Sequence, residues 1–158
     1  MKPLDSIDLA ILEALQADGR MAVSALAKHV GLSGTACTER VRGLEAAGVI
    51  TGYVATLSGP ALGLGLLAFI EVSLERISRE AFDQFRAAVA AIPEIEECHM
   101  VAGGFDYLLK VRVPDMTAYR AFLGEALAQV PGIRQTHSYP VMEEIKQHTR
   151  RNLAHLNV

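Results

Sequence analysis

The sequence predicts an α+β protein, in which a three-helix helix-turn-helix domain precedes a ferredoxin-like domain of order βαββαβ. Apolar residues recur with helical spacing through most of residues 1–50. From residue 66 onward, strand-like stretches alternate with two amphipathic helical segments. We therefore divide the 158 residues into a helical domain over 1–50, a linker strand over 51–60 and a second domain over 61–158 that includes a C-terminal tail.

The first two helices are defined by their end signals. A helix is expected over residues 6–18, because the side chain of Asp5 can accept a hydrogen bond from the backbone three residues later. Gly19 is expected to end it in the left-handed conformation. A second, short helix is expected over residues 23–30, and Gly31 is its stop signal.

The third helix is expected over residues 34–47, with the Ser33 side chain as its cap. The tight turn before it gives a helix-turn-helix layout, in which the exposed side of this helix can enter the major groove of double-stranded DNA. Its capped N-terminus can also bind a phosphate through backbone N–H groups. The candidate DNA-binding residues are Ser33, Gly34, Thr35, Thr38, Glu39, Arg40 and Arg42.

The charge of the chain does not favour DNA binding. The net charge is −3, and residues 1–50 carry five basic and six acidic side chains, whereas DNA-binding domains are usually basic. Helical spacing alone fits three packed helices with a solvated polar face equally well. A sensing oligomer that does not bind DNA therefore remains an alternative.

The second domain begins after a strand expected over residues 49–57, which the sequence at 58–60 interrupts. A strand is expected over 66–74. An amphipathic helix follows, with its apolar stripe over residues 82–92, and Pro93 terminates it.

A hairpin of strands 95–101 and 107–113, a helix over 119–130 and a last strand from 133 to about 142 complete the domain. This order predicts two helices on one face of a four-stranded sheet. The other face, which carries mixed residues such as Leu108, is expected to pair with a second subunit.

Several classes of protein are not indicated. No apolar stretch is long enough to span a bilayer, and the N-terminus lacks a secretion signal, so we expect a cytoplasmic protein with no membrane contact. Cys37 and Cys98 have no disulfide or zinc-site spacing. Cys98 and His99 are adjacent on a predicted strand and point to opposite faces, so they do not suit a catalytic pair. We expect no enzyme activity, metal or cofactor.

Several segments together resemble the Lrp/AsnC family of regulators, most closely its leucine-responsive branch. They are residues 32–45, 48–53, 97–99, 103–110, 114–116 and 141–146. The resemblance extends from Leu4 to about Lys146. It implies DNA binding through the third helix, homodimers formed through the open sheet face, and a higher oligomer, commonly an octamer. It also implies an amino-acid effector such as leucine, held between neighbouring dimers.

The resemblance places the effector near the hairpin turn and the last strand. The candidate effector-binding residues are Gly103, Gly104, Phe105, Asp106, Met116, Tyr139, Pro140 and Val141. Asp106 could bind the α-ammonium group, and the amides of Gly103 and Gly104 could bind the carboxylate. Alternatively, Asp106 caps the hairpin and the glycines only permit its turn. Gly104 and Pro140 depart from the family pattern, which leaves the identity of the effector open.

Overall fold

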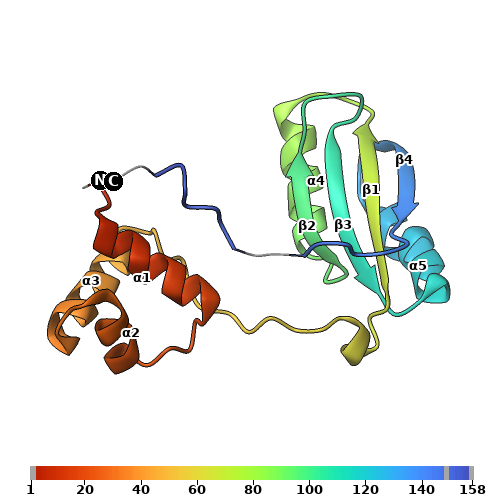
Figure 1. Cartoon of the computed structure of the whole chain (residues 1–158). Coiled ribbons are helices and arrows are strands. Elements are labelled where there is room, and N and C mark those ends of the chain that lie inside the picture. Colours follow the sequence, from red (N-terminus) through yellow and green to blue (C-terminus); the bar gives the residue numbers. More distant parts are fainter. Residues whose placement is uncertain (1–2, 148–149, 157–158) are drawn as a thin grey trace. The chain divides into compact units, whose positions relative to one another are not determined.

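The computed structural model describes residues 3–147 and 150–156, which form two compact units (Figure 1). One unit contains the chain up to Thr56 together with the C-terminal segment from Lys146. The other contains Leu57–Ile145. The two units are described separately below.

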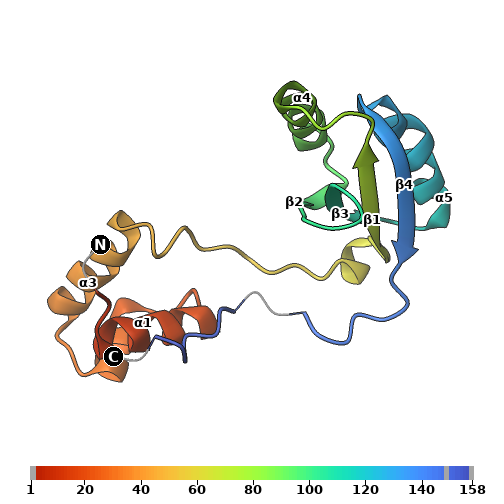
Figure 2. The same ribbon diagram turned by 90° about the horizontal axis from the view of Figure 1, so that it is seen from above.

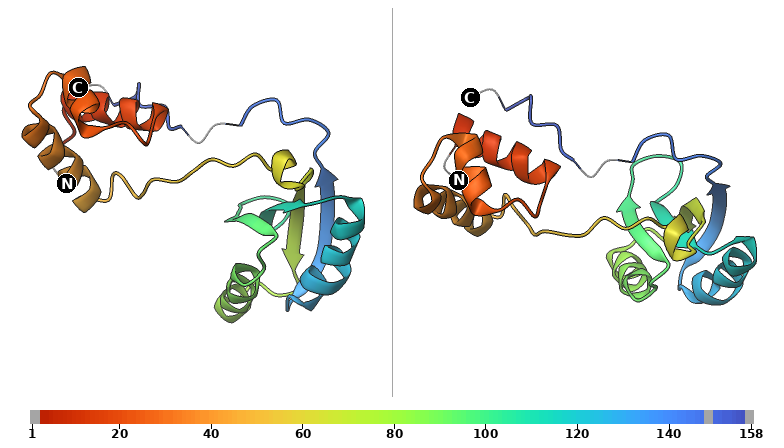
Figure 3. Two further views of the ribbon diagram at one scale, coloured as in Figure 1. Left: turned by 90° about the horizontal axis from the view of Figure 1, so that it is seen from below. Right: turned by 60° about the horizontal axis from the view of Figure 1, so that its bottom comes forward.

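The first unit is a bundle of three helices, shown from two sides in Figure 3. They are α1 (Ser6–Ala17), α2 (Val23–Val30) and α3 (Gly34–Ala46). Their inward sides form one apolar core made of Ile11, Leu12, Ala14, Leu26, Ala27, Cys37 and Leu44. The three predicted helices are therefore confirmed, and Cys37 is a buried thiol within this core.

The helix ends follow the sequence signals with one exception. Asp5 caps α1 and Ser33 caps α3, and Gly31 ends α2 with a φ of 71°. The prediction for Gly19 was wrong, because it has no positive φ. The chain leaves α1 through Asp18 in an extended conformation, and the Asp18 carboxylate accepts a hydrogen bond from the backbone N–H of Arg20 (2.9 Å), which stabilises this turn without a left-handed residue.

The second unit is the predicted ferredoxin-like fold. Its strands are β1 (Leu66–Leu74), β2 (Ile95–Met100), β3 (Tyr107–Val113) and β4 (Ile133–Pro140). They form one sheet of order β2-β3-β1-β4, and all neighbouring strands are antiparallel. Helices α4 (Arg79–Ala90) and α5 (Met116–Ala121) lie on the same face of this sheet (Figure 2).

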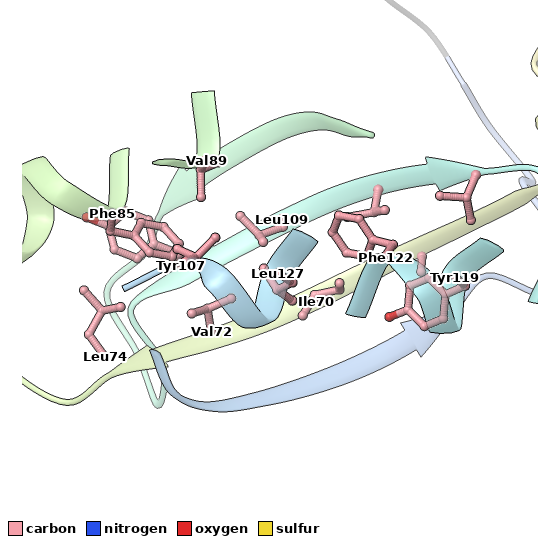
Figure 4. Close-up of a cluster of buried hydrophobic side chains, with 14 residues drawn as sticks. Ile70, Val72, Leu74, Phe85, Val89, Tyr107, Leu109, Tyr119, Phe122 and Leu127 are labelled. Carbon is pink, nitrogen blue, oxygen red and sulfur yellow. The ribbon is translucent and has the colours of Figure 1, made fainter. Parts of the chain in front are cut away.

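The core of the second unit fills the space between the sheet and these helices (Figure 4). Ile70 and Val72 of β1 and Leu109 of β3 point into it and are fully buried. The rings of Phe85 and Tyr107 stack within it at a centroid distance of 4.3 Å. The alternate residues of each strand consequently form the opposite, uncovered face.

The predicted strand over residues 49–57 is not formed. Residues 51–57 carry no regular secondary structure, and the side chains of Val54 and Leu57 are 89% and 71% exposed. A strand needs a hydrogen-bonded neighbour, and no described residue provides one. The apolar composition of residues 49–57 is typical of a strand, but it does not show whether a neighbouring strand is present to pair with them.

Three other boundaries differ from the predictions. The helix expected over 119–130 begins at Met116 and continues beyond Ala121 as a π-helical turn and then a 3₁₀ turn. The last strand ends at Pro140, and the Val141 N–H still donates to the Leu67 carbonyl (2.8 Å), so the proline occupies a position whose N–H the ladder with β1 does not use. The C-terminal tail packs with the helical unit and not with the second domain.

None of the helices within residues 3–147 and 150–156 is long and apolar enough to cross a membrane.

Candidate nucleic-acid interface and ligand site

The exposed side of α3 carries small polar and charged side chains. Thr35, Glu39 and Arg42 are all exposed. The closest atoms of Arg42 and Glu39 are 3.7 Å apart, and both side chains are about 70% exposed. An exposed pair of this kind contributes little stability, so Arg42 can exchange Glu39 for another anion at small cost.

The N-terminus of α3 is capped and open to solvent. Ser33 Oγ accepts a hydrogen bond from the Ala36 N–H (3.2 Å), and Thr38 Oγ1 donates to the Gly34 carbonyl (2.9 Å). A Cβ added at Gly34 would meet no heavy atom within 4 Å. The free amides and positive dipole end of this turn suit a phosphate oxygen.

Arg40 is placed differently from the other predicted DNA-binding residues. Its Nη1 atom lies 2.7 Å from Asp5 Oδ2 and 2.8 Å from Asp8 Oδ1, so its guanidinium joins α3 to the start of α1. The hydrogen bond from Arg40 holds the pKa of Asp5 below its ordinary value. No sequence pattern indicated this pairing, since Arg40 is more than thirty positions from each carboxylate.

The predicted effector residues fall into two groups at opposite ends of the sheet. Asp106 and the turn before it lie at the C-terminal end of β1, because Tyr107 pairs with Val72. Tyr139 pairs with Phe69 near the N-terminal end of β1. Pro140 and Val141 continue toward that end, and Met116 follows the end of β3 there. One subunit therefore does not bring the two groups together.

Asp106 fastens the hairpin turn to β1. Its Oδ2 atom accepts a hydrogen bond from the Leu74 N–H at 2.7 Å, and its own N–H donates to the Val72 carbonyl at 2.9 Å. The Asp106 carbonyl also accepts from the Val101 N–H, which closes the turn. Part of this carboxylate is thus used structurally, as in the alternative role considered from the sequence.

The turn does not require glycine at Gly103 or Gly104. Both residues are exposed and neither has a positive φ. A Cβ added at either position would meet no heavy atom within 4 Å. Their backbone N–H groups therefore lie in a turn that a ligand could approach closely, and backbone conformation does not explain why glycine occurs there.

The second group presents two exposed apolar or aromatic side chains. Met116 and Tyr139 are 48% and 51% exposed. The Tyr139 hydroxyl donates to Glu71 Oε2 at 3.1 Å, and this bond to a carboxylate raises the pKa of Tyr139. The aromatic ring is consequently held over the uncovered face of β1.

The uncovered sheet face is more ionic than predicted. Lys110 Nζ lies 3.2 Å from Glu96 and 3.0 Å from Glu97, and Arg112 pairs with Glu96 at 2.9 Å. Hydrogen bonds from His99 and Lys110 lower the pKa of Glu97. The alternation of apolar and other side chains along β3 already predicted that Lys110 and Arg112 lie on this face. Only the observed register of β2 against β3 shows that the glutamates lie beside them.

No group of three or more His, Cys, Asp or Glu residues in the described part of the chain is arranged to hold a metal ion. Cys98 and His99 pair with successive residues of β3 and so face opposite sides of the sheet. His99 Nε2 instead lies 3.0 Å from Glu97 Oε2.

Two family models cover most of the chain. Residues 4–45 match the AsnC-type helix-turn-helix domain, and residues 67–151 match the Lrp/AsnC ligand binding domain. The leucine-responsive regulatory proteins of Salmonella typhimurium and Escherichia coli K12 are each 54% identical to the chain over 149 residues, which cover 94% of this chain and 91% of those proteins.

Solved structures agree with this likeness over nearly the full length. A transcriptional regulator from Neisseria meningitidis, solved as an L-Met complex, gives a TM-score of 0.93 at 38% identity and covers 98% of this chain and 99% of its own. An AsnC family transcriptional regulator from Agrobacterium tumefaciens gives a TM-score of 0.91 at 38% identity, with coverage of 96% and 99%.

Proposed function

The chain belongs to the Lrp/AsnC family of transcription regulators, and on this basis we propose that it binds operator DNA and responds to an apolar amino acid such as leucine or methionine. The main support for the proposal is that one chain contains both an AsnC-type helix-turn-helix domain and an Lrp/AsnC ligand binding domain. The names of similar proteins support this class of effector. The curated relatives are named leucine-responsive regulatory proteins, and the Neisseria meningitidis regulator was solved as an L-Met complex.

DNA recognition is assigned to the exposed side of α3. Thr35, Thr38, Glu39 and Arg42 meet base edges or phosphates, while the capped turn at Ser33 and Gly34 binds a phosphate through its amides. Arg40 supports this surface indirectly, because its ion pairs fix α3 against α1. The protein acts in the cytoplasm, where its DNA target is found.

Assembly is assigned to the uncovered sheet face. The half-buried apolar side chains of Phe69 and Leu108 lie on this face among the ion pairs, and a second copy would cover them. A two-fold pair also presents two reading helices to successive turns of DNA. We propose that such homodimers assemble further, with an octamer as the expected form.

The effector site is assigned to the junction between dimers. Two subunits can join the hairpin turn of one chain to the far sheet end of another, which unites the groups that a single subunit keeps apart. Asp106 then binds the ammonium group, and the amides of Gly103 and Gly104 bind the carboxylate. Phe105, Met116, Tyr139, Pro140 and Val141 surround the apolar side chain.

A sensing oligomer without DNA binding is the second candidate, and the acidic balance of residues 1–50 favours it. A gel-shift series with the DNA upstream of the protein's own gene separates the two. Phosphate contacts make affinity fall steeply as salt rises, so we expect a strong shift at low salt that weakens progressively. No shift even at low salt would leave the sensing oligomer as the function.

The effector is tested by thermal shift with each of the twenty amino acids. A ligand that binds only the native state at 100 times its Kd adds about 2.7 kcal/mol to the free energy of unfolding. We expect leucine or methionine to raise the Tm most. If none of the twenty raises it, the proposed amino-acid response is wrong.

A further inference from the structure

Glu39 lies at the centre of the exposed side of α3. Residues three and four positions away along a helix are its neighbours on the helix surface. For Glu39 these neighbours are all exposed, and they are Thr35, Ala36, Arg42 and Gly43. Of the four, only Arg42 has a long side chain. A groove that receives this side of α3 can therefore come close to the Glu39 carboxylate.

The Glu39 carboxylate has no firm partner in the described part of the chain. Its contact with Arg42 Nη1, at 3.7 Å, is longer than a hydrogen bond. The adjacent guanidinium of Arg40 is already bound to Asp5 and Asp8. No described residue donates a hydrogen bond to the Glu39 side chain, so both of its oxygens remain available as acceptors.

The position of Glu39 along α3 suits contact with a base. In helix-turn-helix proteins the N-terminal part of the recognition helix contacts base edges, and Glu39 lies in the first half of α3. Thr38 is less available, because it is half-buried and its hydroxyl donates to the Gly34 carbonyl at 2.9 Å. Glu39 is thus a long side chain with a free acceptor at the part of the helix that reaches furthest into the groove.

The chemistry of a carboxylate restricts what it can contact on DNA. It is repelled by phosphates, and it accepts hydrogen bonds but donates none. The major-groove edges offer it two amino groups, cytosine N4 and adenine N6. Adenine N6 lies between two acceptors, its own N7 and O4 of the paired thymine, whereas cytosine N4 has one such neighbour, O6 of the paired guanine. Cytosine is therefore the favoured partner.

We propose that Glu39 determines operator specificity by accepting a hydrogen bond from N4 of a cytosine in the major groove. This inference rests on the proposed function, because it requires α3 to enter that groove. Arg42, one turn further along α3, reduces the repulsion between Glu39 and the DNA by contacting a nearby phosphate. In a two-fold dimer each half-site then contains one such C·G base pair.

The inference also accounts for the acidic balance of residues 1–50. Attraction between basic side chains and phosphates supplies most of the affinity for DNA of any sequence. A DNA-binding domain with little net positive charge gains little from this attraction. A larger share of its binding free energy must then come from contacts with particular bases, such as the one assigned to Glu39.

The test is selection from a library of random DNA duplexes by the full-length wild type, Glu39→Gln and Glu39→Ala. We expect the wild type to select a C·G pair at one position of each half-site, and its replacement by A·T to weaken binding about 5- to 150-fold in gel-shift titrations. Glu39→Gln should select A·T at this position, because glutamine pairs with N6 and N7 of adenine. Glu39→Ala should discriminate there by less than about twofold and keep the preferences at the other positions.

Glu45→Gln is the matched control for loss of charge. Glu45 lies six residues after Glu39, on a different side of α3. It accepts a hydrogen bond from the Tyr53 hydroxyl at 3.0 Å, which a glutamine oxygen can also accept. This variant should bind all duplexes somewhat more tightly and select the same sequence as the wild type.

The outcomes separate this inference from the proposed function. If Glu39→Gln behaves like Glu45→Gln, with the wild-type sequence still selected, Glu39 only repels phosphates and the inference is overturned. An A·T preference of the wild type at the position that Glu39→Ala affects would also overturn it. A wild type that selects no sequence and shifts no duplex at low salt refutes the proposed function itself. Circular dichroism should show wild-type melting for all three variants, since Glu39 and Glu45 are exposed.

Discussion

Two substitutions of Asp106 separate its structural role from its proposed role in ligand binding. Asp106→Ala deletes the acceptor of the 2.7 Å hydrogen bond from the Leu74 N–H. A hydrogen bond to a charged group contributes about 1.5–3 kcal/mol. One kcal/mol shifts the Tm of a 60–100-residue domain by about 4–8 °C, so we expect the Tm of the sheet domain to fall by roughly 6–24 °C.

Asp106→Asn keeps an oxygen that can accept the same bond but removes the negative charge. The loss of stability should then be only about 1 kcal/mol. The ammonium group of the effector loses its charged partner, which should weaken binding by roughly 10- to 100-fold. Asp106→Asn therefore tests the ligand role in a protein that keeps its turn.

The assay is thermal unfolding of wild type and both variants, each with and without the active amino acid. We expect Asp106→Asn to show a Tm only about 4–8 °C below that of the wild type, but little ligand-induced rise. A full ligand-induced rise in Asp106→Asn would refute the ammonium role. A Tm in Asp106→Ala equal to that of Asp106→Asn would refute the contribution assigned to the bond with Leu74.

Three further predictions concern the helical domain. Arg42→Ala should weaken operator binding and reduce the salt dependence by about one phosphate contact, with no change in oligomer size by light scattering; unchanged affinity would exclude Arg42 from the interface. Because the pKa of Asp5 is lowered by Arg40, this pair stabilises the domain above about pH 4, and that stability is lost as the pH falls through the lowered value. Circular-dichroism melts from pH 6 to 2 should show a steeper acid loss in wild type than in Asp5→Asn, and parallel curves would contradict this. Gly43→Ala should raise the free energy of unfolding by about 1 kcal/mol in urea titrations, since a Cβ there meets no heavy atom within 4 Å; a decrease would reveal crowding.

Local signals predicted the parts of the fold that local interactions determine. The caps at Asp5 and Ser33 and the left-handed Gly31 are each set within a few residues of the chain, and all three are confirmed. The alternation of apolar and other residues along 107–113 likewise predicted a strand with one face of the sheet buried. These features needed no knowledge of distant partners.

Features that depend on long-range partners were not predictable from the sequence. Residues 49–57 have strand-like composition, but no described segment pairs with them. The ion pairs that Arg40 makes with Asp5 and Asp8 at the start of α1 join residues distant in the sequence. The docking of residues 150–156 on Gln16 joins segments 135 positions apart. The candidate effector residues could be named, but their separation along β1 required the strand register.

The separation of Asp106 from Tyr139 along β1 has a physiological consequence. With the effector site proposed above, an isolated polypeptide holds only half of the amino-acid contacts, so nutrient sensing would depend on how many copies of the regulator a cell contains. At low copy number the apparent sensitivity to the nutrient would fall, because each binding event would also have to bring dimers together. Expression level would then set the nutrient threshold at which the target genes respond.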